Sequence, residues 1–112
     1  MDIKATKKDE ITIIEISGNL DANSATQAQN EIMPFLTQGC IIVLDMSKCQ
    51  YVSSAGLRLL LTIAKRLKAI EGKWCIAGLL DEVNDVMEMT GFANFFETYS
   101  TVEKAIDAVR KG

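Results

Sequence analysis

The chain has 112 residues, the length of one domain, and neither a linker nor a second core interrupts it. Hydrophobic residues make up 48% and charged residues 24%, as in an ordinary soluble globular protein. The formal net charge is −3, whereas proteins that hold nucleic acid by its phosphates carry a basic patch, so nucleic acid is a poor candidate ligand. No apolar run is long enough for a membrane helix, and no signal-peptide core follows the N-terminal lysines. We therefore expect a cytoplasmic protein without membrane contact.

Cysteine and histidine usage argues against a metal site or a disulfide. The chain has three cysteines at widely separated positions and no histidine. Cys40 and Cys75 each begin an apolar, strand-like segment, which is typical of small buried hydrophobic residues. We therefore expect no metal ion and no cofactor.

The first third of the chain predicts a β-hairpin followed by a helix. Residues 11–17 are rich in β-branched side chains, and residues 3–7 form a weaker strand that pairs with them around Asp9. Residues 24–33 have a helix-forming composition, with Asn23 or Ser24 as the N-cap. Pro34 cannot continue this helix without a clash, so we expect a kink or an end near it.

The middle of the chain predicts a buried strand, a long amphipathic helix and a further strand. Residues 40–46 are nearly all apolar for five positions, which indicates a strand buried on both faces. Residues 73–78 form the next strand. Between them, apolar residues recur at steps of three and four up to Gly72 and predict the helix; they are Leu57, Leu60, Leu61, Ala64 and Leu67.

The last third predicts two helices separated by a short strand. The first spans Asp81–Met89 and stops at Gly91, and the strand covers residues 95–99. The final helix begins at a capping box in which Ser100 caps and Glu103 reciprocates. The order ββαβαβαβα predicts a single α/β domain over residues 1–112. Its mainly parallel sheet of about five strands has an antiparallel edge strand, and about four helices lie mostly on one face.

One junction in the chain could carry function. It follows the buried strand and ends on Ser53, Ser54, Ala55 and Gly56 at the start of the long helix. Unpaired N–H groups and the helix dipole favour negative charge there, so the fold would tolerate a phosphate on either serine. On spacing alone, a simple helix cap is the more common explanation.

The same junction resembles the signature of STAS-domain anti-sigma factor antagonists. The resemblance is carried by Val-Leu-Asp-Met-Ser at residues 43–47 and Tyr-Val-Ser-Ser-Ala-Gly-Leu at residues 51–57. Residues 18–21 and 87–92 agree with it, so it covers essentially the whole chain. In that family the serine two places before the glycine is phosphorylated, which corresponds to Ser54, with Ser53 as second choice. The family often has aspartate where this chain has Ser53.

The resemblance implies a regulatory binding protein. Its expected partners are an anti-sigma factor that is a serine kinase of the histidine-kinase-like ATPase type and a PP2C-type phosphatase. The unphosphorylated form would bind the kinase and release its client, a sigma factor, and phosphorylation of Ser54 would abolish binding. Residues implied in partner binding are Asp21, Ser53, Ser54, Gly56, Leu57 and Arg58. For Asp21, an exposed turn before a helix is an equally good explanation. Arg58 begins a basic flank of the long helix, and such a flank is more often a solvated helix face.

Two other classes of function remain. An enzyme is disfavoured because the chain lacks a histidine base, a Gly-rich phosphate loop and any residue that would activate Ser54. The alternative is a STAS subunit of a lipid-transport or stress-sensor complex without a phosphoswitch. Leu59, Ile63 and Ile70 widen the apolar stripe of the long helix, which favours a broad core face over a docking surface.

Overall fold

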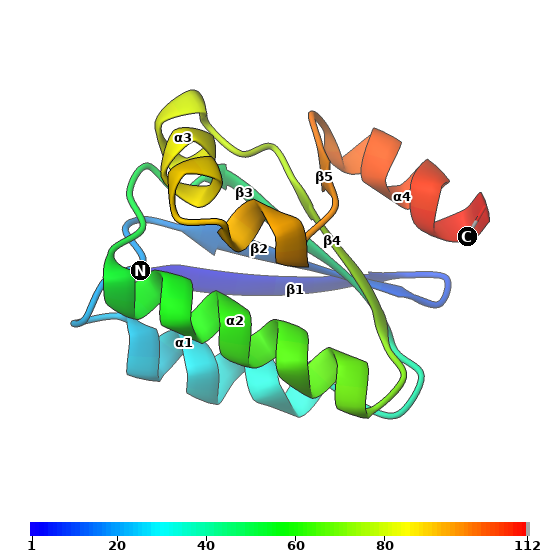
Figure 1. The fold of residues 1–112 in the computed structure, drawn as a ribbon. Coiled ribbons are helices and arrows are strands. Elements are labelled where there is room, and N and C mark those ends of the chain that lie inside the picture. The colour runs from blue at the N-terminus through cyan, green and yellow to red at the C-terminus, as the bar shows by residue number, and fades with distance from the viewer. Residues whose placement is uncertain (112) are drawn as a thin grey trace.

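The computed structural model describes residues 1–111, and its elements follow the predicted order (Figure 1). Two short 3-10 helices, η1 and η2, are added to it. In chain order the elements are β1 (Asp2–Lys8), β2 (Ile11–Ser17), α1 (Ala25–Ile32), η1 (Met33–Phe35), β3 (Ile41–Lys48), α2 (Ser54–Ala69), β4 (Lys73–Ala77), α3 (Asp81–Met89), η2 (Phe92–Phe95), β5 (Thr98–Tyr99) and α4 (Val102–Lys111).

The sheet has the spatial order β1-β2-β3-β4-β5, with β3 at its centre. β1 and β2 form an antiparallel hairpin whose turn places Asp9 at φ 56°, and every other neighbouring pair is parallel. Because parallel neighbours need a crossover, a helix follows each of β2, β3 and β4. The predicted α/β fold and its antiparallel edge strand are confirmed.

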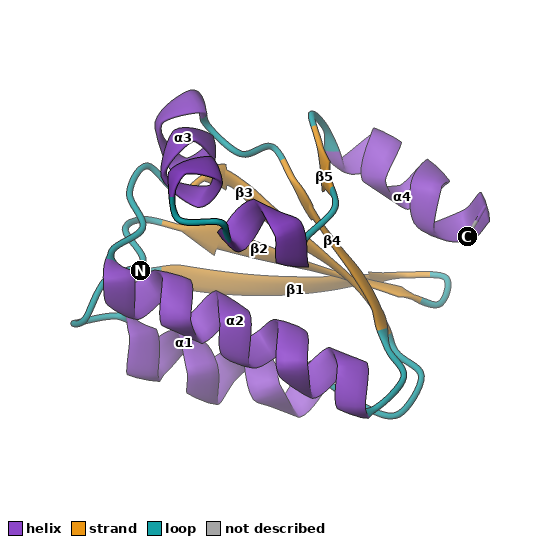
Figure 2. Ribbon diagram, viewed as in Figure 1, coloured by secondary structure: helices purple, strands orange, loops and turns teal. Residues whose placement is uncertain are grey.

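Helices cover both faces of the sheet, unequally. α1, α2 and α3 pack on the face that carries Ile14, Leu44 and Ile76. Of the helices in residues 1–111, α4 alone packs on the face that carries Val43 and Cys75. Figure 2 shows α1 and α2 side by side across the sheet and α4 apart from them. The expectation that most helices share one face is confirmed. None of the helices within residues 1–111 has the length and apolar character needed to cross a membrane.

Leu59, Ile63 and Ile70 of the α2 region are all buried in the main core. The wide apolar stripe of α2 is therefore a core face. Its breadth follows from the two neighbours of the helix, because α2 packs against α1 and the sheet together.

Several predicted ends shift by one to three residues; for example, the long helix ends at Ala69 and the strand at residues 73–78 ends at Ala77. Two differences are larger. Residues 95–99 are not one strand: Phe95 ends η2, and β5 has only Thr98 and Tyr99. The predicted capping box is also wrong, because the N–H of Lys104 donates to the hydroxyl of Thr101 at 3.2 Å. Thr101 therefore caps α4 in place of Ser100, and Glu103 lies in the first turn of the helix.

Candidate functional site

The two serines at the start of α2 lie in different environments. Ser53 is the N-cap, with extended backbone (φ −82°, ψ 177°), and its hydroxyl oxygen accepts a hydrogen bond from the N–H of Gly56 at 3.3 Å. Ser54 is the first helical residue and is exposed. The hydroxyl of Ser53 thus caps the helix, whereas Ser54 is accessible to solvent.

The loop after β2 is bonded directly to the segment before α2. The N–H of Leu20 donates to the carbonyl of Tyr51 at 2.9 Å, and the N–H of Ser53 donates to the carbonyl of Leu20, also at 2.9 Å. Leu20 and Val52, both buried, form a parallel bridge between the two segments. These contacts fix the two serines relative to residues 18–21.

Gly56 allows this close approach. A Cβ at Gly56 would lie 2.4 Å from the carbonyl oxygen of Leu20 and 2.9 Å from Cγ1 of Val52. The first of these distances is far inside van der Waals contact, and its partner is backbone. The glycine of the junction is therefore needed for α2 to pack against the loop.

Asp21 organises the turn that leads into α1. Its Oδ1 accepts hydrogen bonds from the N–H groups of Asn23 at 2.9 Å and Ser24 at 3.2 Å. The Ser24 hydroxyl donates to the carbonyl of Asn19 at 2.7 Å and accepts from the N–H of Asp21 at 3.0 Å. Ser24 occupies the expected N-cap position, but its side chain makes no capping bond to α1. The carboxylate of Asp21 is half-buried, on a loop that contacts the start of α2.

The remaining predicted site residues divide by burial. Gly56 and Leu57 are buried, and Leu57 belongs to the core, so they position the helix. Arg58 is exposed one turn after Ser54. The structure also adds Tyr51, which is 54% exposed immediately before the bridge to Leu20. The sequence signal for Tyr51 is an aromatic residue in the loop between a buried strand and a helix.

Ser54 is an exposed serine at the first position of α2. Within residues 1–111, no three His, Cys, Asp or Glu side chains gather in a way that could hold a metal ion. The buried thiol of Cys49 donates to the carbonyl of Tyr51 at 3.4 Å, and burial raises the pKa of this thiol. Cys49 therefore stays protonated at neutral pH and is a weak nucleophile.

Comparisons with known proteins agree with this geometry. The STAS domain family model matches residues 2–105. BtrV of Bordetella bronchiseptica, which carries the name of an anti-sigma factor antagonist, is 31% identical over 111 residues, covering 98% of this chain and 96% of that protein. Solved structures that share the fold include two kinds of protein.

The first is the anti-sigma factor antagonist SpoIIAA. Its unphosphorylated form has a TM-score of 0.80 at 24% identity, over 99% of this chain and 98% of that one. The phosphorylated form, from Bacillus, has a TM-score of 0.72 at 22% identity, over 96% and 99%. The second is a sulfate transporter family protein of Wolinella succinogenes, with a TM-score of 0.81 at 14% identity over 94% and 88%. The STAS family model matches residues 2–105, and BtrV is 31% identical over 98% of this chain. The chain therefore belongs to the STAS-domain family of anti-sigma factor antagonists.

Proposed function

We propose that this partner-switching regulator is controlled by phosphorylation of Ser54. The unphosphorylated protein binds an anti-sigma factor that is also a serine kinase of the histidine-kinase-like ATPase type, and so releases a sigma factor. Phosphorylation of Ser54 ends this binding, and a PP2C-type phosphatase restores it. The exchange takes place in the cytoplasm, and the protein itself catalyses no reaction.

The exposure of Ser54 carries the proposal. A kinase must reach the hydroxyl that it modifies, and Ser54 is exposed at the first position of α2. Ser53 is half-buried, and its oxygen holds the N–H of Gly56. Phosphorylation of Ser53 would disturb the helix cap, whereas phosphorylation of Ser54 leaves the cap in place. The existence of SpoIIAA structures in unphosphorylated and phosphorylated forms is consistent with a fold that survives modification.

The surroundings of Ser54 favour a phosphate in the isolated protein. The first turn of α2 contains no acidic residue, and its N–H groups present the positive end of the helix dipole. Arg58 follows Ser54 by four residues on the same exposed side, a spacing at which an acidic group and a cation attract each other. The modification should therefore leave stability nearly unchanged.

The effect on binding can be large for a simple electrostatic reason. A phosphate adds a charge of roughly −2. If the partner covers Ser54 without offering a cation, that charge loses its water without compensation. A hundredfold loss of affinity corresponds to about 2.7 kcal/mol, which such a desolvation readily exceeds.

The alternative is a STAS subunit of a lipid-transport or stress-sensor complex without a phosphoswitch. The shared fold of the Wolinella succinogenes protein shows that fold alone does not decide between these functions. Identification of the protein that co-purifies with this chain separates them, since only the phosphoswitch requires an ATP-dependent kinase.

Mass mapping after incubation with the co-purifying kinase and ATP tests the proposal. Wild type should gain one phosphate, on Ser54. Ser54→Ala should still bind the kinase and gain none, and Ser54→Asp should fold but bind at least about a hundredfold more weakly. Ser53→Ala is the matched control and should still be phosphorylated. Phosphate on Ser53, or undiminished phosphorylation of Ser54→Ala, contradicts the assignment, as does phosphorylation without the kinase.

A further inference from the structure

The outer edge of the sheet beside β4 is only partly covered. β5 pairs with two residues of β4, Ile76 and Ala77, although β4 begins at Lys73. The N–H of Ile76 donates to the carbonyl of Glu97 at 2.9 Å. The backbone N–H and C=O groups of Ile76, and of every second residue from it along β4, therefore point toward the β5 side. Figure 2 shows β5 beside the C-terminal part of β4 only.

The backbone N–H and C=O groups of Trp74 face the open edge of β4. The N–H of Lys73 donates to the carbonyl of Cys40 on the β3 side, so the next residue, Trp74, points the other way. β5 pairs with β4 only at Ile76 and Ala77, so no residue of β5 pairs with Trp74 on this side. An unpaired donor and acceptor at a strand edge form a template for one more extended segment.

A cavity of about 450 Å³ lies over this edge, between η2 and α4. Its walls include Trp74, Phe95, Tyr99 and Val109. Phe95 is 52% exposed, and the other three residues are half-buried. Three of these four partly exposed side chains are aromatic. The volume falls within the range of pockets that bind ligands.

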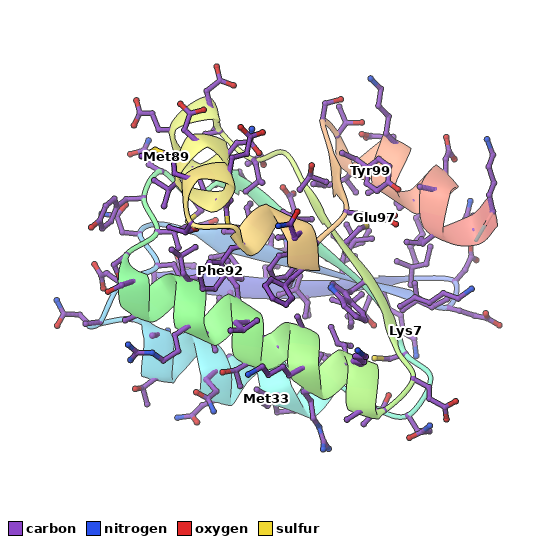
Figure 3. The ribbon with its side chains drawn as sticks, in the orientation of Figure 1. Lys7, Met33, Met89, Phe92, Glu97 and Tyr99 are labelled. Atoms are coloured by element: carbon purple, nitrogen blue, oxygen red, sulfur yellow. The ribbon has the colours of Figure 1, made fainter. Side chains whose placement is uncertain are left out.

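The charges around the cavity indicate an uncharged occupant. Lys73 and Glu97 both line it, and they carry opposite charges. The hydroxyl of Tyr99 donates to Oε2 of Glu97 at 3.0 Å, and Figure 3 shows these two side chains near each other beside α4. This hydrogen bond raises the pKa of Tyr99, which keeps the phenol neutral. The lining thus offers no net charge for an ionic ligand to match.

We propose that the open edge of β4 binds a short, extended, uncharged peptide segment of a partner protein. The segment adds to the sheet beside Trp74, where its backbone pairs with the N–H and C=O of that residue. One apolar side chain enters the cavity between Phe95 and Val109. This edge site is separate from the start of α2 and does not depend on the role of Ser54.

Trp74 provides a direct readout, because it is the only tryptophan of the chain. The probe is the peptide acetyl-Thr-Val-Leu-Val-Thr-amide, whose β-branched residues favour an extended backbone. Titration into the full chain should change the emission of Trp74 saturably and slow the hydrogen exchange of its amide. A control peptide with N-methyl groups on its central residues cannot pair with the strand and should not bind.

Two variants complete the test. Ala108 lines the cavity and is half-buried, so Ala108→Phe should fill the cavity and weaken peptide binding at least about tenfold. Its neighbour Asp107 is exposed on the same helix, and Asp107→Phe should bind as wild type does. Unchanged Trp74 emission, equal binding of the N-methylated peptide, or undiminished binding by Ala108→Phe overturns the proposal. Ser54→Ala should bind the peptide normally, which keeps this test independent of the phosphoswitch.

Discussion

Replacement of Gly56 by alanine tests how the start of α2 is held. The new Cβ would lie 2.4 Å from the carbonyl oxygen of Leu20, so the loop and the helix must separate. Separation breaks the hydrogen bond from the N–H of Ser53 to Leu20 and strains the one from Leu20 to Tyr51. Each such bond contributes about 1 kcal/mol, and overpacking of a tight contact costs about 1–3 kcal/mol.

Alanine in place of glycine within a helix recovers about 0.5–1 kcal/mol, which leaves a net destabilisation of about 2–4 kcal/mol. Urea unfolding followed by the emission of Trp74 measures this difference. Ser54→Ala, two residues earlier and exposed, is the control and should change stability by no more than about 0.5 kcal/mol. The displaced loop should also weaken binding of the kinase partner. A Gly56→Ala protein as stable as wild type would refute the packing argument.

Three further outcomes are expected. Ser53→Ala should lower the free energy of unfolding by about 1 kcal/mol through loss of the helix cap, measured by urea unfolding beside Ser54→Ala; equal stability of the two variants contradicts the assignment of the cap. Val43→Asp should abolish folding, because Val43 is fully buried and a charge there has no partner; a cooperative thermal transition by circular dichroism contradicts this. At pH 8, iodoacetamide should modify half-buried Cys40 first. Cys75 should react only after unfolding, because burial raises its pKa to about 11, and peptide mass mapping identifies which cysteine is modified.

The regular elements could be predicted because their signals are local. The strand at residues 11–17 and the helix at residues 81–89 have the predicted bounds. β-branched side chains mark the strand and Gly91 marks the end of the helix, and both signals depend only on residues close in the sequence. The first helix also ends before Pro34, as the ring of proline requires. For the same reason the buried central strand was identified from its unbroken apolar run.

The details that were missed depend on contacts between distant segments. Phe95 lies in a 3-10 helix although its neighbours suit a strand, and the next residue, Phe96, is buried in the main core. The bridge between Leu20 and Val52 joins loops 32 positions apart, and no local pattern marks it. The candidate site was found for a different reason: the Ser-Ser-Ala-Gly junction matches a family, whereas the spacing alone favoured an ordinary cap.

The single helix on the second face of the sheet has a consequence for the newly made chain. Ala105 and Ile106 of α4 cover Ile11 and Val43, which belong to elements synthesised much earlier. α1, α2 and α3 come before α4 in the chain, so the helices that cover the first face leave the ribosome before the helix that covers the second. The apolar second face therefore stays exposed to water until residues 102–111 have left the ribosome and packed on it. A chaperone would bind the new chain at this face.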